Sequence, residues 1–173
     1  MFRELQCADN LNSTYFDHSF TDRQLWQMVT LNAAKALHAE AKIGTLQVGR
    51  VADIAIYDAK TNADYRAVID GSPNTVALVL RGGEALYGDD AVVAALTPSG
   101  CDTVDVCSTG KRVCAQGDIG KSYAQLVTSV GAIYPAFFCG APQNEPSCAP
   151  KRPAAVDGSN TYTGIPDSSD NDG

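Results

Sequence analysis

Residues 75–87, Thr75-Val76-Ala77-Leu78-Val79-Leu80-Arg81-Gly82-Gly83-Glu84-Ala85-Leu86-Tyr87, contain two β-rich runs on either side of a pair of glycines. Glycine tolerates the positive φ angles of the tight turns between antiparallel strands, so Gly82-Gly83 predicts a β-hairpin. Upstream, residues 51–57 form a third β-rich run that is apolar at both alternating sets of positions. That pattern predicts a strand covered on both faces. Three strands alone cannot close a core, so other elements must cover them.

The clearest helix start lies just after Phe20. Thr21 is a suitable N-cap residue, and Gln24, three positions later, completes a capping box. Phe20 is placed to pack onto Leu25 as a hydrophobic staple. The apolar stripe that follows at helical spacing consists of Leu25, Trp26, Met28 and Val29. A break is expected at residues 30–32, after which a second helix begins.

The second helix is alanine-rich, and Asn32 can serve as its cap. It is expected to run to Leu37 and to end before Gly44. Residues 91–96 predict a short helix later in the chain, and residues 123–130 predict another. From residue 153 onward the chain carries Asp but no Lys or Arg, which predicts an acidic, disordered linker.

The composition fits one ordinary domain and argues against two kinds of partner. The chain has 173 residues, of which 45% are hydrophobic, enough to build a core. Thirteen Lys and Arg stand against 20 Asp and Glu, which gives a net charge of -7, so no nucleic-acid partner is expected. No stretch approaches the roughly 20 apolar residues that cross a bilayer, so no membrane span is expected. The first five residues also lack the apolar run of a signal peptide.

The cysteines cluster in the C-terminal part of the chain, apart from Cys7. The clustered ones are Cys101, Cys107, Cys114, Cys139 and Cys148. Their spacing is wider than the close pairs of zinc sites, which favours disulfides and therefore an extracytoplasmic (periplasmic or secreted) location. The cluster leaves one cysteine over, and whether Cys7 is its partner stays open. Disulfide chemistry without a signal peptide predicts that the true N-terminus lies upstream of Met1.

Few residues could carry catalysis. His18 lies in an expected loop and His38 near a predicted helix C-terminus, and neither belongs to an H-x-H or H-E-x-x-H motif. A structural role is favoured for both. The sequence also lacks a G-x-S-x-G elbow, a P-loop and a dinucleotide-binding fingerprint. No catalytic, cofactor-binding or metal-binding residue is predicted in this chain.

Three further features receive structural interpretations. Asp53 lies inside an apolar strand pattern, where its carboxylate should meet backbone amides or a basic side chain. Asn12-Ser13-Thr14 matches a glycosylation sequon, a triplet that is common by chance. Residues 164–173 alternate oxygen-bearing side chains as calcium loops do, but they lack EF-hand spacing and a bidentate Glu, so an acidic linker is favoured.

Residues 25–37, LWQMVTLNAAKAL, are followed by residues 43–58, IGTLQVGRVADIAIYD, which carry the pattern G-x4-G-x-x-A-D. These two segments resemble the C-terminal region of metal-dependent amidohydrolases, including imidazolonepropionase-like members. Residues 79–87 are similar to the hairpin that closes this region in the family. Helix, strand and hairpin occur in the family's order. The cysteine-rich region and the tail lie outside the resemblance.

The resemblance implies a (β/α)8 barrel whose last helices lead into a β-sandwich shared between the two ends of the protein. Residues 21–37 would be the terminal barrel helices, and residues 51–57 and 75–87 would be returning sandwich strands. Residues 2–20 would be a loop at the mouth of the active site. Such enzymes use a divalent metal, here expected to be zinc, to activate water for attack on a non-peptide C–N bond of a small molecule. The family's metal ligands precede the matched region, so none is carried onto this chain.

The expected fold is an α+β fragment with four parts. They are a barrel loop and helices at 1–42, sandwich strands at 43–96, a cysteine-rich extension at 97–150 and a tail at 151–173. The chain alone is expected to bind no metal, to be inactive and to need an N-terminal barrel portion, in the same or a separate chain. Without that partner the helix side chains Leu25, Trp26 and Met28 would lack a packing surface. Two alternatives stay open: a free-standing secreted binding module stapled by disulfides, and a subunit that completes a barrel supplied by another chain.

Overall fold

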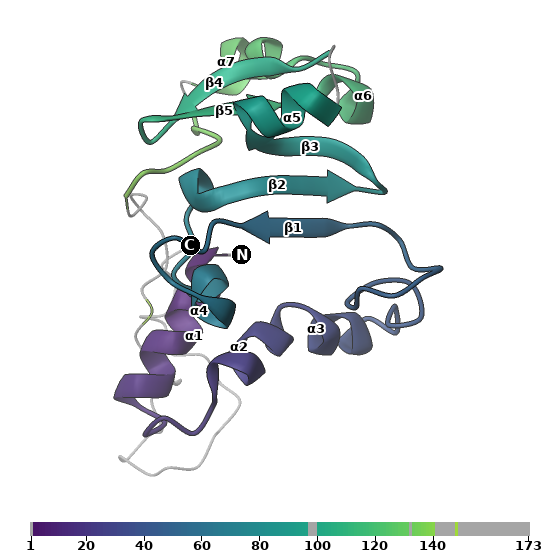
Figure 1. The fold of residues 1–173 in the computed structure, drawn as a ribbon. Coiled ribbons are helices and arrows are strands. Elements are labelled where there is room, and N and C mark those ends of the chain that lie inside the picture. The colour runs from purple at the N-terminus through teal and green to yellow at the C-terminus, as the bar shows by residue number, and fades with distance from the viewer. Residues whose placement is uncertain (1, 97–99, 132, 141–147, 149–173) are drawn as a thin grey trace, which may run out of the picture.

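The computed structural model describes residues 2–96, 100–131, 133–140 and 148, and it combines helices with one antiparallel sheet (Figure 1). The helical elements are α1 (Phe2–Thr14), α2 (Asp22–Met28), α3 (Leu31–Ala36), α4 (Asp64–Ile69), the 3-10 turn η1 (Pro73–Thr75), α5 (Asp90–Leu96), α6 (Gln116–Ile119) and α7 (Tyr123–Val130). The strands are β1 (Ile54–Tyr57), β2 (Val76–Arg81), β3 (Glu84–Asp89), β4 (Asp102–Val106) and β5 (Thr109–Val113). The expected α+β class is confirmed. The predicted tail, with its calcium-like pattern, lies outside the described residues.

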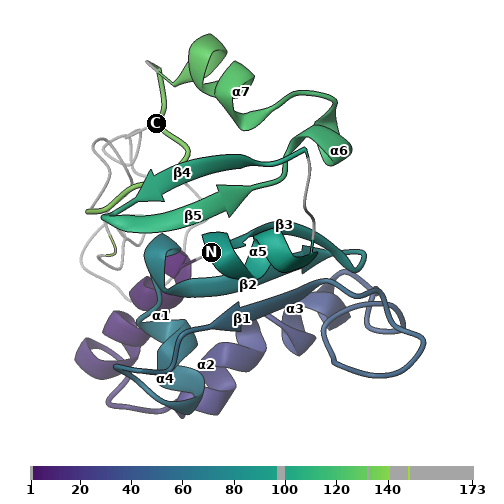
Figure 2. The ribbon, with the colours of Figure 1, turned by 45° about the horizontal axis from the view of Figure 1, so that its top comes forward.

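The sheet has five strands in the order β1-β2-β3-β5-β4, with antiparallel neighbours throughout. Figures 1 and 2 show α1 to α4 gathered at the β1 end of the sheet, with α6 and α7 at the β4 end. The predicted β2–β3 hairpin is confirmed, since Arg81 pairs with Glu84 across the turn. Gly82 and Gly83 take φ angles of 58° and 91°, which explains the two glycines.

Three clusters of buried side chains hold these elements together. The first lies on the sheet and consists of Val76, Tyr87, Val106 and Val113. The second lies between the sheet and α5 and consists of Leu78, Ala85, Val93 and Cys114. The third joins α1, α2 and α4 and consists of Leu5, Leu25 and Ile69. The sheet and the N-terminal helices therefore have separate buried clusters, and Phe2 of α1 makes an apolar contact with the first of them.

The expected loop at residues 2–20 is wrong for most of its length, because α1 occupies residues 2–14. Its two buried positions are Leu5, which is apolar, and Asn12, which is polar. Because one of these two positions is polar, the segment lacks the regular apolar spacing that predicts an amphipathic helix. The helix gains its stability from tertiary contacts of Leu5 and from the hydrogen bonds of Asn12 described below.

The prediction that the α2 stripe lacks a packing surface is wrong for Leu25 and Trp26. Leu25 is buried against Leu5 of α1 and Ile69 of α4. The ring of Trp26 lies 5.2 Å from that of Tyr65, measured between centroids. Helix α4, which no pattern in the sequence predicted, contributes Ile69 and Tyr65 to this packing surface.

The boundaries of α2 and α3 are partly as predicted. Thr21 is the N-cap of α2, and it exchanges hydrogen bonds with Gln24 in a capping box. The predicted cap Asn32 is wrong, because Asn32 lies inside α3. Thr30 occupies the cap position, but its hydroxyl donates to Trp26 O at 3.0 Å in the preceding helix and caps nothing.

Strand β1 is present but is not covered on both faces. It is the edge strand of the sheet, and Ala55 and Ile56 are exposed. The interpretation of Asp53 is confirmed, because its Oδ1 accepts a hydrogen bond from Gly82 N at 2.7 Å. The neighbouring Gly83 N donates to Ala52 O at 2.9 Å. Residues 52 and 53 thus hold the hairpin turn.

The cysteine-rich region adds two strands that no pattern in the sequence predicted. Strands β4 and β5 form a second hairpin, and β5 pairs with β3, so both continue the same sheet. The six cysteines form the disulfides Cys7–Cys148, Cys101–Cys114 and Cys107–Cys139. The preference for disulfides is confirmed, and Cys7 is the partner of one C-terminal cysteine. In the described ranges, no helix has the length and apolar character needed to cross a bilayer.

Candidate functional site

The two histidines lie in different turns of the fold. His18 is in the turn between α1 and α2, and His38 follows α3. Both residues are exposed and take a φ of 54°. Within the part of the chain that the structure describes, no three or more His, Cys, Asp or Glu side chains are grouped so that they could hold a metal ion.

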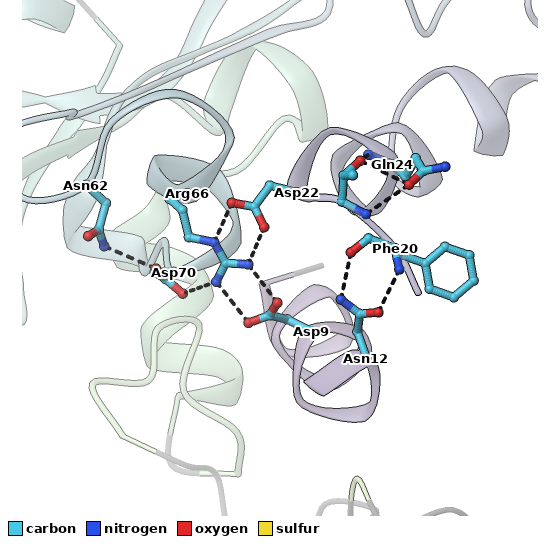
Figure 3. Close-up of polar contacts among 9 residues, drawn as sticks. Asp9, Asn12, Phe20, Asp22, Gln24, Asn62, Arg66 and Asp70 are labelled. Atoms are coloured by element: carbon cyan, nitrogen blue, oxygen red, sulfur yellow. Dashed lines mark hydrogen bonds and ion pairs between the residues drawn. The ribbon is translucent and has the colours of Figure 1, made fainter. Parts of the chain in front are cut away.

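A cluster of charged side chains surrounds Arg66 of α4 (Figure 3). Its guanidinium donates hydrogen bonds of 2.8 and 2.7 Å to Asp22, and others of 2.9 and 2.6 Å to Asp9. Asp70, one turn further along α4, lies 3.4 Å from the guanidinium and accepts a hydrogen bond of 3.2 Å from Asn62. Two bidentate contacts to carboxylates are the strong form of this interaction.

These contacts join three helices and do not form a reactive site. Asp9 belongs to α1, Asp22 to the first turn of α2, and Arg66 to α4. The pKa of Arg66 is raised by its hydrogen bonds, most by the one to Asp9 and next by the one to Asp22. The hydrogen bond from Arg66 in turn lowers the pKa of Asp22. A guanidinium that stays charged, with its donors engaged, is a poor proton donor and has little left to offer a ligand. We therefore assign this cluster a structural role.

The sequon asparagine also has a structural role. Asn12 is only 4% exposed. Its Nδ2 donates to Phe20 O at 2.8 Å, and its Oδ1 accepts from Phe20 N at 2.9 Å (Figure 3). Because the side-chain amide is buried and used at both ends, it is not accessible to glycosylation in this fold. It fixes the turn that leads into α2.

Lys111 of β5 is a buried cation, with 1% of the residue exposed. Its Nζ donates to Asp89 Oδ1 at 2.5 Å and to Val76 O at 2.8 Å. Beside it, burial raises the pKa of Tyr87 to about 12, and the Tyr87 hydroxyl donates to Pro73 O at 2.7 Å. All of these groups are paired within the sheet and none lines the cleft described next. They hold strands together.

A cleft of about 560 Å³ lies at the tip of the β2–β3 hairpin, beside α6. Its polar lining consists of Arg81, Glu84, Gln116 and Asp118, and the disulfide Cys101–Cys114 also borders it. An ion pair joins Arg81 to Asp118. The volume falls within the range of small-molecule sites, roughly 300 to 1,000 Å³.

Two groups that often carry catalysis are not offered by the lining of this cleft. Its two cysteines are joined in a disulfide, so neither is a thiolate nucleophile. Its lining contains no histidine to act as a base. Sequence reasoning missed this cleft because its polar residues come from β2, β3 and α6 and share no motif.

Comparisons with known proteins connect the first half of the chain to one family. A family model described as "Amidohydrolase family" matches residues 12–87, a little under half of the chain. An imidazolonepropionase of Fusobacterium nucleatum subsp. nucleatum is 42% identical over 45 residues, which are 26% of this chain and 11% of that enzyme. The chain thus spans only a small part of that relative's length. No solved structure matches the chain.

The matched residues run from the end of α1 to the β3 strand, through both helices of the α2–α3 pair, β1, α4 and the hairpin. They include Ala52 and Asp53, which hold the hairpin turn, and the glycines of that turn. The three segments that carry the resemblance, residues 25–37, 43–58 and 79–87, therefore all lie within the matched range. Over residues 12–87, this chain is therefore similar to the amidohydrolase family.

Proposed function

We propose that this chain is the C-terminal part of a metal-dependent amidohydrolase-type enzyme that hydrolyses a non-peptide C–N bond of a small molecule. The observation that carries the proposal is the family match over residues 12–87. In this proposal α2 and α3 are the terminal barrel helices, and β1, β2 and β3 are strands of the composite sandwich. A divalent metal, zinc, would supply an activated water in the complete enzyme.

The described residues do not fit that metal, so its ligands would have to come from the barrel portion. His18 and His38 lie in different turns, and no cluster of three or more ligating side chains occurs among the described residues. Asp9 and Asp22, the nearest approach to a carboxylate pair, are bound to Arg66. The role proposed for this chain is to close the barrel and the sandwich, and we expect the chain alone to be inactive.

Exposed apolar side chains on the matched segment support a missing partner surface. They are Tyr15, Phe16, Phe20, Met28, Leu37, Leu46, Val48, Val51 and Ile56. Leu46 and Val48 are 81% and 101% exposed. Exposed apolar side chains that form a continuous patch mark a surface that a partner covers. The partner would be the barrel portion, in the same or a separate chain.

The proposed location is extracytoplasmic, and the three disulfides support it. Disulfides persist in oxidising compartments and are rare in a reducing cytosol. Free-thiol titration of the chain isolated from its native host under acid quench tests this point. We expect no free thiol, and six free thiols in the native pool would contradict it.

The function is tested on the oxidised chain as it stands. We expect no stoichiometric zinc by elemental analysis and no turnover of amide, lactone or deaminase substrates. Tight zinc binding together with turnover would show that the chain is catalytically complete. A second test reads the DNA immediately upstream: an in-frame barrel with an H-x-H motif and a closing Asp supports the proposal, and a stop codon contradicts it for a single chain.

The second candidate is a free-standing, disulfide-stapled binding module. It is favoured by the way β4 and β5 continue the sheet of β1 to β3, and by the complete pairing of the cysteines. This candidate predicts a monomer with one cooperative unfolding transition that is sensitive to reductant. The first proposal predicts association through the exposed apolar side chains of the matched segment. Sedimentation combined with denaturant unfolding separates the two.

A further inference from the structure

The segment that follows α7 lies over the sheet and is fastened there at two points. We call residues 133–139 the strap. Cys139 forms a disulfide with Cys107, which lies in the turn of the β4–β5 hairpin. The ring of Phe137 stacks on Tyr87, with 5.1 Å between centroids and 26° between planes. One fastening is therefore covalent and the other is apolar.

The strap covers the first buried cluster of the sheet. Phe137 packs against this cluster, and Tyr87 within it is 8% exposed. Helix α7 has no fully buried residue, but its Tyr123 packs against the same cluster, and the Tyr123 ring lies 5.9 Å from that of Phe137. The helix is also tied to the sheet through Asp102, whose Oδ2 accepts a hydrogen bond of 2.7 Å from Tyr123 N. The strap itself is held by Phe137, which lies between Tyr87 and Tyr123, and by the disulfide of Cys139.

The strap disulfide is more accessible than its neighbour in the sheet. Cys139 is exposed and Cys107 is half-buried. In the neighbouring disulfide, which borders the cleft, Cys101 is half-buried, and Cys114 is 9% exposed and belongs to the buried cluster under α5. Disulfide exchange requires a thiolate to reach one of the sulfur atoms, so exposure governs which bond reacts first. A reductant in solution should therefore open Cys107–Cys139 before Cys101–Cys114.

The strap disulfide lies outside the strand pairs of the sheet. The β4–β5 ladder runs from the Asp102–Val113 pair to the Val106–Thr109 pair, and Cys107 lies in the turn beyond it. Strand β5 also pairs with β3. At the other end of the hairpin, the less exposed disulfide Cys101–Cys114 closes the ladder.

We infer that Cys107–Cys139 is a reducible latch: a thiol reductant releases the strap and uncovers the Tyr87 face while the sheet stays folded. A thiolate attacks one sulfur, forms a mixed disulfide and releases the other cysteine as a thiolate, which takes up a proton. A second reductant thiol then displaces the first from the protein. Two reductant thiols become one disulfide, and the cysteine pair becomes two thiols. The latch is independent of the proposed hydrolase function.

The test exposes the oxidised chain to glutathione buffers of increasing reducing power. Samples are quenched in acid and alkylated, and each cysteine pair is quantified by mass spectrometry. We expect Cys107–Cys139 to open about tenfold faster than Cys101–Cys114, because of its greater access. Hydroxyl-radical labelling of the partly reduced chain should rise at the rings of Tyr87 and Phe137, which cover each other in the oxidised chain, while hydrogen exchange should show retained protection in β3 and β5.

A pair of variants provides the control. Cys107→Ser combined with Cys139→Ser should raise the labelling of Tyr87 and Phe137 without reductant. Cys7→Ser combined with Cys148→Ser should leave their labelling unchanged. Earlier opening of Cys101–Cys114, unchanged labelling of Tyr87 once Cys107–Cys139 is open, or loss of hydrogen-exchange protection in β3 at the same point would overturn the latch. If the first variant does not fold, the wild-type reduction series decides alone.

Discussion

Ala52 and Asp53, which come just before β1, accept hydrogen bonds from the turn of the β2–β3 hairpin. The carboxylate of Asp53 accepts from Gly82 N, and the carbonyl of Ala52 accepts from Gly83 N. These two backbone amides lie at the tip of the hairpin, where no partner strand is available to them. In this chain, the Ala-Asp pair of the G-x4-G-x-x-A-D motif therefore holds the β2–β3 turn beside the start of β1.

Replacing Asp53 should loosen that turn. We expect Asp53→Ala to lower the free energy of unfolding by about 1 kcal/mol at most, because Gly82 N loses its acceptor at an exposed site, where water can replace it. Asp53→Asn keeps a side-chain oxygen and should recover most of the loss. Urea unfolding of both variants checks this. Equal losses for the two would mean that the charge, and not the hydrogen bond, matters.

Lys111 makes a larger contribution because it is buried. In Lys111→Met the volume is nearly conserved, but Asp89 and Val76 O lose a buried donor. We expect unfolding to become easier by about 1 to 3 kcal/mol. A double-mutant cycle with Asp89→Asn measures the coupling between the two side chains. A coupling near zero would show that Lys111 stabilises the sheet through Val76 O alone.

At the level of elements, Gly44 decides how closely the loop before β1 approaches α3. Its φ is 87°, and a Cβ there would lie 2.6 Å from the Cβ of Ala34. Gly44→Ala should therefore cost more than about 1 kcal/mol in stability. Gly49→Ala is the matched control, since Gly49 has a similar φ of 85° but no neighbour within 4 Å. The difference between their unfolding free energies isolates the steric part, and equal losses would contradict a close approach.

The ion pairs of Arg66 join α1, α2 and α4, so we expect their loss to destabilise the packing of all three helices. Arg66→Leu leaves Asp9 and Asp22 without their shared cation, and we expect a loss of about 2 kcal/mol in the free energy of unfolding. Arg23→Leu is the control, because Arg23 is an exposed residue of α2. Its effect should stay within about 0.5 kcal/mol. Denaturant unfolding compares the two, and similar losses would rule out a special role for Arg66.

The same cluster should give the protein part of its acid sensitivity. Arg66 lowers the pKa of Asp22 in the folded chain, so the pairing adds stability above the unfolded pKa of about 3.9. That stability is lost as the pH falls through the lower, folded pKa. Unfolding measured between about pH 6 and pH 3 should therefore depend less on pH in Arg66→Leu than in the wild type. Identical pH profiles would contradict this assignment.

Local signals predicted some elements well and could not predict others. The capping box of Thr21 and Gln24 and the two glycines of the hairpin act within a few residues, so both were readable in the sequence. Helix α1 and the β4–β5 hairpin were not, because one depends on Asn12 meeting Phe20 and the other on pairing with β3. The Arg66 cluster joins α1, α2 and α4, and the cleft joins β2, β3 and α6. Both arise only when distant elements meet.

At the scale of the whole molecule, residues beyond the family match form β4 and β5, and these two strands extend the sheet of β1, β2 and β3. The match ends at residue 87, within β3, and β5 pairs with that strand. The disulfide Cys7–Cys148 then ties the far end of this extension to α1. The N-terminal helices and the sheet, which have separate buried clusters, are thereby linked through one covalent bond.

That bond should matter more to global stability than the short one within the sheet. Cys7 and Cys148 are 141 residues apart in sequence, and Cys101 and Cys114 are 13 apart. The chain-entropy model assigns about 5 kcal/mol to closing the larger loop and about 3 to the smaller. We expect Cys7→Ser with Cys148→Ser to lower the free energy of unfolding by about 2 kcal/mol more than Cys101→Ser with Cys114→Ser does. Urea unfolding under non-reducing conditions measures both. A larger loss for the short loop would mean that packing of Cys114 in the α5 cluster outweighs chain entropy.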